Sequence, residues 1–356
     1  MTFPRPLVEL LSKLVVCLAL GTMAARGASP EEPLWAYGFV TPGSPGERAP
    51  VPTHVTAART LRPGEDAGEQ LRKRHIDGSA AAFSLLEIRN GNEVADWFPG
   101  EHPPLTPIMK HGPARLGQNA LGCAFCHMPN GRGRPENAPV AGLPEAYFIR
   151  QMEDMRHGLR TSAEPRKANT LNMIFLAQAM TDAEIRETAK YFAGLTWTPW
   201  IRVVETDRVP RTRISTNMFL PIEKEPTELL GARIIEVPED VEATELLRDP
   251  HRGFIAYVPF GSVRKGHDLV TTGGGALVDG KPASCVTCHG PDLNGVGEVP
   301  GIAGRSPSYI ARQLYDIQQG TRKGALAELM RPVVAHLTND DFVAIAAYVS
   351  SLPPGK

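Results

Sequence analysis

The stretch LGCAFCHMPNGRGRP, residues 121–135, contains two cysteines two residues apart and a histidine directly after the second. This first motif, CAFCH (123–127), recurs as a second motif, CVTCH (285–289), 162 residues later. Cys17, the fifth cysteine, lies in an apolar run near the N-terminus. Every other cysteine therefore belongs to a motif that occurs twice.

The sequence after each motif repeats as well. AGLPEAYFIRQMEDMRHGLR (141–160) and AGRSPSYIARQLYDIQQGTR (303–322) share eight residues at the same offset of 162. MTDAEIRETAKYFAGL (180–195) then matches LTNDDFVAIAAYVSSL (337–352) at an offset of 157. The chain therefore contains two copies of a domain of roughly 90 residues. The first copy has five extra residues before its last helix.

Three chemistries use a Cys-x-x-Cys pair: a redox disulfide, half of a zinc site, and covalent haem attachment. A redox pair does not need the histidine, and a zinc site takes four ligands, usually from two such pairs. Haem attachment uses every residue, because the thiols add to the two vinyl groups and the histidine binds the iron. The motifs thus predict two covalently bound haem c groups. The residues that would hold them are Cys123, Cys126, Cys285 and Cys288, with iron ligands His127 and His289.

A second axial ligand would fill the free coordination position of each iron, and methionine sulfur in this position favours Fe(II). The chain has ten methionines, but only Met173 aligns with another methionine, Met330. Each lies seven residues before the methionine or leucine that precedes the last helix. Met173 and Met330 are therefore the predicted distal ligands. His336 is the alternative for the second haem, and His157 and His111 are the alternatives for the first.

A carbonyl group is expected to orient each motif histidine through its other ring nitrogen. In the second copy the candidate is Pro300; in the first, it is Ala138 in strict register or Pro139 one residue later. The eight other histidines occupy no shared position in the copies and are predicted to lie at the surface.

Two pairs of shared residues have two interpretations each. Tyr147 and Tyr309, and Arg160 and Arg322, have the chemistry to bind haem propionates. Packing tyrosines and solvated arginines are the simpler interpretation, and it is the one favoured here.

Each copy is predicted to be mainly helical. A helix carries each motif, a loop rich in glycine and proline follows, and an amphipathic helix surrounds Tyr147 or Tyr309. Thr181 and Thr338 are predicted N-caps of the last helix, with acidic residues in the first turn.

Two regions lie outside the copies. In the extension 29–104, Ser84 and Glu87 form a capping-box pattern, and DWFPGEHPP (96–104) is predicted to be an ordered, packed aromatic loop. In the linker 197–259, β-branched and aromatic residues predict two or three short strands. These runs are WIRVVETDRV, ARIIEVPED and GFIAYVPF.

The motifs, Met330 and the closing LTNDDFVAIAAYVSSL resemble class I c-type cytochromes in their tandem dihaem form. The resemblance covers 105–196 and 260–353, about half of the chain. The first copy departs from the family, because Met128 replaces the usual glycine after the histidine and an insertion precedes Met173. The resemblance implies two tandem class I cytochrome c-like helical domains. Together with the irregular N-terminal extension and a linker that holds a few short strands, both outside the resemblance, the expected fold is mainly α. The resemblance also implies haem c and one-electron transfer.

The N-terminus predicts export. Arg5 and Lys13 flank the start of the apolar run LVVCLALGTMA (14–24), and small residues follow. This pattern is typical of a secretory signal peptide, placed at 1–28, and it indicates a periplasmic location. The run is short for a membrane span, and a retained anchor stays an alternative.

The expected function is electron transfer without catalytic residues of its own. A dehydrogenase or quinol-oxidising complex would donate electrons and a terminal oxidase or reductase would accept them, with membrane association only through a partner complex. The net charge of −1 gives no reason to expect nucleic acid. Two alternatives stay open. One is a peroxidase-like or thiosulfate-oxidising dihaem enzyme with one open haem, and the other is a cytochrome subunit of a quinoprotein dehydrogenase.

Overall fold

A computed structural model describes residues 32–39, 64–275, 277–278, 281–353 and 355. Contacts divide the chain into Met1–Glu32 and Pro33–Lys356, and every described residue except Glu32 belongs to the second unit. The predicted signal peptide and His54 lie outside the described residues.

The described elements are mainly helices. The α-helices are α1 (Ala67–Leu71), α2 (Leu85–Ile88), α3 (Pro107–His111), α4 (Cys123–His127), α5 (Glu145–Arg156), α6 (Ala168–Ala179), α7 (Asp182–Ala193), α8 (Ser262–Thr272), α9 (Cys285–His289), α10 (Pro307–Gln318), α11 (Ala325–Val334) and α12 (Asn339–Ser351). Shorter helical turns are Leu34–Tyr37, Ala114–Asn119, Glu242–Leu246 and Gly273–Gly275. The strands are β1 (Ile201–Glu205), β2 (Arg208–Pro210), β3 (Thr212–Ser215), β4 (Met218–Pro221), β5 (Thr227–Leu229), β6 (Ile235–Pro238), β7 (Phe254–Val258), β8 (Leu277–Val278), β9 (Lys281–Pro282), β10 (Gly295–Val296) and β11 (Val299–Pro300).

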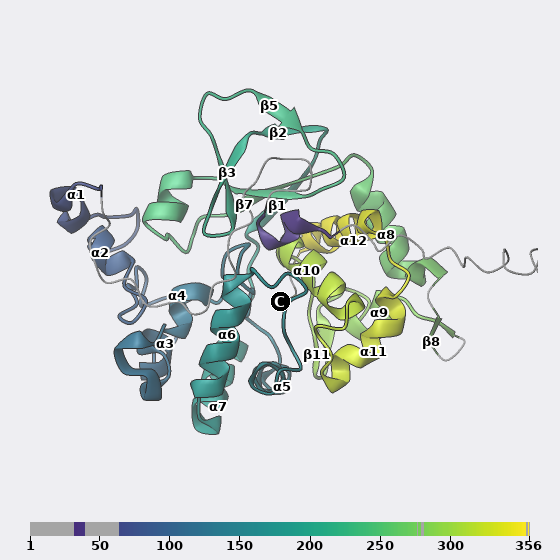
Figure 1. The fold of residues 1–356 in the computed structure, drawn as a ribbon, viewed down its shortest axis with the longest axis horizontal. Coiled ribbons are helices and arrows are strands. Elements are labelled where there is room, and N and C mark those ends of the chain that lie inside the picture. The colour runs from purple at the N-terminus through teal and green to yellow at the C-terminus, as the bar shows by residue number, and fades with distance from the viewer. Residues whose placement is uncertain (1–31, 40–63, 276, 279–280, 354, 356) are drawn as a thin grey trace, which may run out of the picture. The chain divides into compact units, whose positions relative to one another are not determined.

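Each copy contributes its own group of helices. In the first copy, α5 packs against both α6 and α7, and in the second copy, α10 packs against α11 and α12 (Figure 1). The closing helices α7 and α12 begin at the predicted N-caps. Thr181 and Thr338 each accept a backbone N–H from the third helical residue, whose carboxylate accepts the N-cap N–H in return.

The two copies differ in the helix that precedes the motif. In the second copy, α8 crosses α12 at Gly266, where a Cβ atom would lie 2.0 Å from the Ala344 carbonyl oxygen. Glycine permits this close approach of two backbones. The first copy has the five-residue α3 in this place, and Pro107 stands at its first turn. Pro103 and Pro104, just upstream, disfavour a longer helix.

The predicted strands of the linker are confirmed. β1, β7 and β6 form one sheet in the order β1-β7-β6, with β1 parallel and β6 antiparallel to β7. α12 packs against β1 and β7, so this sheet covers part of the second copy. The hairpin β3-β4 and the pair β2-β5 add antiparallel ladders that the sequence analysis did not predict.

The N-terminal extension packs against the linker. The capping box of Ser84 and Glu87 is present and opens α2. The loop 96–104 is ordered, and Trp97 and Phe98 are buried in a small apolar cluster that Leu246 and Leu247 join. The predicted packing role of this loop is confirmed. Within the described ranges, no helix combines the length and apolar character that a membrane span requires.

Candidate functional site

Both motifs fold in the same way. Each forms a five-residue helix, α4 or α9, and the histidine is its last residue. His127 and His289 are both buried, with exposed fractions of 7% and 6%. Nδ1 of His127 lies 2.8 Å from the Ala138 carbonyl oxygen, and Nδ1 of His289 lies 2.8 Å from that of Pro300. The predicted carbonyl partners are confirmed, and the first copy uses the one in strict register.

These carbonyl bonds determine the protonation of each ring. A carbonyl oxygen only accepts a hydrogen bond, so Nδ1 must carry the proton and Nε2 is left with a lone pair. Burial lowers the pKa of both histidines, although the carbonyl bond works in the opposite direction. Each ring is therefore a neutral imidazole with Nε2 available to a metal.

Three of the four motif cysteines are in an environment that keeps them as thiols. Burial raises the pKa of Cys123 to about 12 and that of Cys285 to about 11, and it also raises the pKa of Cys126. A thiol redox catalyst needs a lowered pKa instead. Within the described residues, no three His, Cys, Asp or Glu side chains gather as a metal cluster. The two motifs are thus not brought together as one zinc site.

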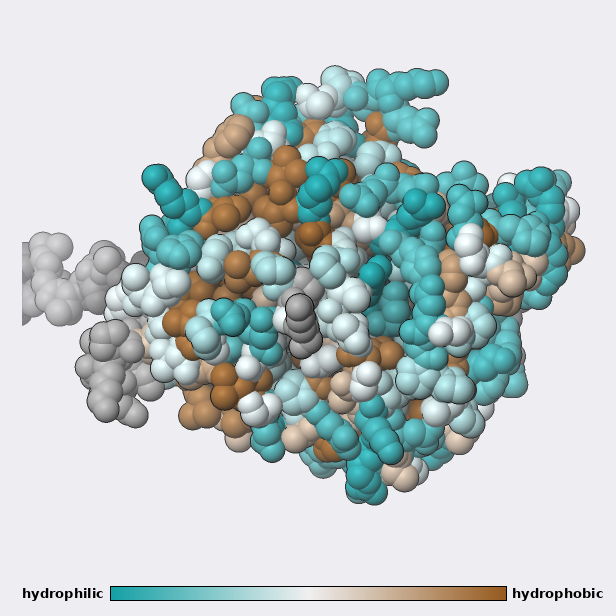
Figure 2. Space-filling model, turned by 180° about the vertical axis from the view of Figure 1, so that it is seen from behind, coloured by the Kyte–Doolittle hydropathy of each residue, from teal (hydrophilic) through white to brown (hydrophobic). Residues whose placement is uncertain are grey.

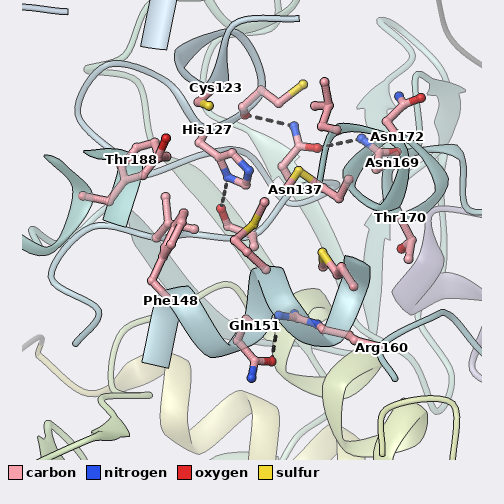
Figure 3. Close-up of a pocket in the computed structure, with 18 of the residues that line it drawn as sticks. Cys123, His127, Asn137, Phe148, Gln151, Arg160, Asn169, Thr170, Asn172 and Thr188 are labelled. Atoms are coloured by element: carbon pink, nitrogen blue, oxygen red, sulfur yellow. Dashed lines mark hydrogen bonds between the residues drawn. The ribbon is translucent and has the colours of Figure 1, made fainter. Parts of the chain in front are cut away.

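A large cavity adjoins the first motif. It measures about 1280 Å³, part of it open to solvent, and Cys123, Cys126 and His127 line one side (Figure 3). Apolar side chains cover much of the remaining wall, among them Leu143, Phe148 and Phe192. His127 points into this space in the close-up, with Phe148 below it (Figure 3).

Charged and polar side chains also line the cavity. They are the arginines Arg160 and Arg312, the amine of Lys167, the carboxylates Glu136 and Asp316, and the hydroxyl of Tyr309. An apolar chamber with two thiols and an imidazole in its lining fits a haem, whose ring is apolar, and the two arginines suit its anionic propionates. The residues present therefore suit the predicted cofactor.

The same cavity brings Met173 toward the first motif. Met173 is half-buried on α6 and lines the cavity opposite the motif residues, but so do Met152, Met155 and Met180. The geometry does not single out one sulfur, and the repeat remains the observation that favours Met173. Asn169 on α6 donates to Asn137 Oδ1 at 2.6 Å, and Asn137 donates to the Cys126 carbonyl at 3.1 Å. This chain of amides joins α6 to α4 (Figure 3).

The second copy places its predicted residues in equivalent positions. Met330 is the sixth residue of α11, as Met173 is the sixth of α6. Met330 and Cys285 are half-buried and pack against the same apolar core, which includes Tyr315 and Phe342. Cys288 is exposed, whereas both cysteines of the first motif are half-buried.

The shared tyrosines and arginines form the contact between the copies. Arg160 donates to Gln313 Oε1 at 2.9 Å, and Arg322 donates to Gln151 Oε1 at 2.9 Å. Arg322 also donates to the Tyr147 hydroxyl at 2.8 Å. Both arginines are buried, with exposed fractions of 8%. The favoured interpretation as solvated arginines is wrong, because each arginine of one copy is matched to an amide of the other.

The remaining histidines divide into two groups. His157 and His336 are exposed, as predicted, and His111 donates from Nδ1 to the Asn92 carbonyl oxygen, 2.8 Å away. His102 contradicts the prediction, because its side chain is only 3% exposed. Its Nε2 lies 3.1 Å from Asp96 Oδ1, so a carboxylate compensates for burial.

Sequence reasoning missed two groups of residues around the first motif. Lys167 is the N-cap of α6, where α11 of the second copy has Gly324. It is 2% exposed, with Nζ 3.2 Å from the Tyr37 carbonyl oxygen. Arg248 of the linker donates to the Phe125 carbonyl and stacks on the Phe125 ring. No local pattern marked either residue.

Comparisons with known proteins agree with this geometry. A family model described as "Cytochrome c" matches residues 273–353. The chain is 29% identical over 249 residues to cytochrome c4 of Azotobacter vinelandii, a match of 68% of this chain and 90% of that protein.

Two further relatives are similar to different lengths of the chain. Cytochrome c-554(548) of Halomonas halodenitrificans is 38% identical over 80 residues, 22% of this chain and 96% of that protein. A thiosulfate dehydrogenase electron acceptor of Thiomonas intermedia is 25% identical over 237 residues, 66% of this chain and 80% of that protein. With two motifs, a repeated helical unit and these relatives, the chain belongs to the c-type cytochromes, as a tandem dihaem member that carries haem c covalently and transfers electrons.

Proposed function

We propose that the protein is a periplasmic relay that passes single electrons between two redox proteins. In this proposal Cys123 and Cys126 bind the first haem as thioethers, and Cys285 and Cys288 bind the second. The proposed iron ligands are His127 with Met173 and His289 with Met330. The proposed haem domains are 105–196 and 260–353, with 29–104 and 197–259 as supporting segments and 1–28 as the signal peptide.

The observation that carries the proposal is the identical setting of the two histidines. Each is buried at the end of a Cys-x-x-Cys helix, and each donates from Nδ1 to a carbonyl 2.8 Å away. The carbonyl keeps the ring in the tautomer that a metal requires and fixes its orientation. A histidine that served only packing would not need this setting twice.

The chain contributes positioning and burial. A bound haem c supplies a one-electron Fe(III)/Fe(II) couple. Around it, the apolar wall of Leu143, Phe148 and Phe192 excludes water, which lowers the reorganisation that each electron transfer requires. The Arg160 and Arg322 network fixes the distance between the copies, so that electrons can pass from one to the other within one molecule.

The surface is consistent with weak, transient partners. Figure 2 shows apolar side chains interspersed with hydrophilic ones over the visible face. Exposed apolar side chains include Phe260, Leu329 and Val296. Electron-transfer encounters use interfaces at the small end of the size range. We place the donor and acceptor among periplasmic redox proteins.

The attachment proposal is tested by the mass of the intact protein, made in cells that mature c-type cytochromes. The full chain should carry two haems. A variant with Cys285→Ala and Cys288→Ala should keep one, and a variant with Cys123→Ala and Cys126→Ala should keep the other. Two haems on either variant would overturn the assignment of the cysteines.

A second candidate concerns the donor, and the similarity to a thiosulfate dehydrogenase electron acceptor favours it. In this version the protein receives electrons from a thiosulfate-oxidising dehydrogenase. Stopped-flow absorbance separates the options. Rapid haem reduction that needs both thiosulfate and the purified dehydrogenase supports an acceptor, whereas reduction by thiosulfate alone supports a thiosulfate-oxidising enzyme.

A further inference from the structure

Arg248 of the linker lies on the first motif. Its guanidinium donates to the Phe125 carbonyl, and its Cζ lies 4.3 Å from the centre of the Phe125 ring. Phe125 stands between the two cysteines of the motif, one residue before Cys126. Arg248 is 123 positions away from Phe125 in the sequence and nevertheless contacts the helix that is proposed to carry the first haem.

The turn that carries Arg248 is held from two sides. Trp97 of the N-terminal extension donates from Nε1 to the Leu247 carbonyl at 2.8 Å. On the other side, Asn130 and Arg132 of the first copy donate to the Pro250 carbonyl at 3.0 and 3.1 Å. Arg248 itself has a φ of 53°, a backbone conformation that costs free energy in a residue with a side chain. The surrounding contacts therefore fix a strained residue in this place.

The guanidinium brings a positive charge to the first motif. Burial lowers the pKa of Arg248 to about 9, so the group keeps its proton at neutral pH. Nearby Arg134 pairs with Glu136 at 2.6 Å, and these two charges oppose each other. Within the described part of the chain, no carboxylate forms an ion pair with Arg248. Its positive charge therefore lies directly on the motif, and Glu136 acts on it only from beyond ion-pair distance.

The second motif has a different setting. Its cysteine Cys288 and the neighbouring Thr287 are exposed, and no linker turn lies on them in the described residues. The second copy also lacks an equivalent of Arg134, because strict register places Val296 at that position. Water screens charges at an exposed site much more strongly than at a covered one.

We propose that Arg248, positioned by Trp97, raises the reduction potential of the first haem and thereby sets a potential difference between the two haems. A fixed cation close to the haem favours the reduced iron, which carries one positive charge less. The extension and the linker lie outside the two repeated copies, and in this proposal they hold the charge of Arg248 in position. The inference rests on the proposed haem attachment.

The test is a spectroelectrochemical titration of the full-length dihaem protein, with the haem-methyl proton resonances reporting each haem separately. Arg248→Gln should lower the potential of the first haem and leave that of the second unchanged. Arg248→Lys keeps the charge and should restore most of the difference. Trp97→Phe, which removes the hydrogen bond to Leu247 together with part of a buried ring, should shift the first haem in the same direction by a smaller amount.

Arg264→Gln is the matched control, since it removes an exposed cation from α8 of the second copy. It should leave the first haem unchanged. Equal potentials in wild type and Arg248→Gln would overturn the inference, and so would an equal fall in Arg248→Lys and Arg248→Gln. Intact mass, measured on each sample, distinguishes this failure from that of the proposed function. Two haems with an unchanged potential contradict only the role of Arg248.

Discussion

At the scale of single residues, the position after each motif histidine has a positive φ. Gly290 adopts 85° and Met128 adopts 63°. Glycine occupies this region freely, whereas a side chain is strained there. In the first copy, burial of Met128, which is 5% exposed, offsets that strain. The departure from glycine at this position is therefore compatible with the same turn.

Gly290→Ala should destabilise the folded protein by about 1 kcal/mol, because it brings the strain without a compensating buried side chain. Its Cβ would also lie 3.1 Å from Val296 Cγ2. Denaturant unfolding of the holoprotein measures the change. Gly100→Ala is the control, since Gly100 has neither a positive φ nor a neighbour within 4 Å. Equal stability of the two variants would contradict the strain argument.

Met330→His should keep the second haem attached and lower its reduction potential, because imidazole stabilises Fe(III) more than a thioether does. Leu329→His is the matched control, since Leu329 directly precedes Met330 on α11 and is 68% exposed. A redox titration of both variants measures the effect. An unchanged potential in Met330→His would remove this methionine from the site.

The buried His102 predicts a pH dependence of stability. Burial lowers its pKa, but the bonds to Asp96 and the Pro103 carbonyl raise it more, so the net shift is upward from 6.5. The protonated ring therefore contributes stability that is fully present below 6.5 and is lost as the pH rises through the higher folded pKa. His102→Gln should flatten the fall in Tm over this window, and exposed His157→Gln should not. Parallel curves for His102→Gln and wild type would refute the assignment.

Residue chemistry was only partly readable from the sequence. The carbonyl partners of the motif histidines were predicted because they follow each motif at a constant distance of eleven residues. Arg160 and Arg322 were assigned to solvent because a single sequence does not reveal that two equal surfaces face each other. The burial of His102 depends on its hydrogen bonds to Asp96 and Tyr191. No periodic pattern in the sequence indicates such contacts between distant residues.

At the scale of elements, the sequence predicted where three helices begin. Thr181, Thr338 and Ser84 all form the capping boxes that their sequences indicate. The pairing of β1 with β7 joins segments about 50 residues apart, and local patterns give strands without giving their partners. Local chemistry thus determines where an element starts, while tertiary contacts determine what it packs against.

Gly266→Val should destabilise the second copy by roughly 3 kcal/mol, because the added side chain would separate α8 from α12. The added Cβ alone would meet the Ala344 carbonyl at 2.0 Å. Thr271→Val, an exposed β-branched substitution on the same helix, should have little effect. Thermal unfolding monitored at the haem absorbance compares them. A Tm for Gly266→Val equal to that of Thr271→Val would contradict the close crossing.

At the scale of the whole molecule, the two copies meet through residues that they share. Arg160 and Arg322 also form an antiparallel bridge, with Thr161 donating to the Thr321 carbonyl and Lys323 to that of Leu159. Several residues that the copies share, among them Arg160, Arg322, Gln151 and Gln313, thus serve both copies at one contact. Nothing in the sequence of a single copy indicates this contact, because each arginine looks solvated until its partner surface is present.

Arg160→Gln combined with Arg322→Gln should loosen the contact between the copies. Each change leaves buried amides and hydroxyls of the opposite copy without a donor, at a cost of about 1–3 kcal/mol per group. Calorimetry should then resolve two transitions where the wild type gives one. Arg150→Gln, which removes a half-exposed ion pair with Glu298, is the control. A single transition in the double variant would argue against this network as the main coupling.

We propose that a second axial ligand closes both haems, so that neither iron is open to a substrate. The optical spectrum of the purified protein, oxidised and reduced, with and without carbon monoxide, tests this directly. We expect a methionine-to-iron band in the oxidised protein and a reduced spectrum that carbon monoxide does not change. Carbon monoxide binding to either haem would contradict it, since an open iron site is what a dihaem enzyme requires.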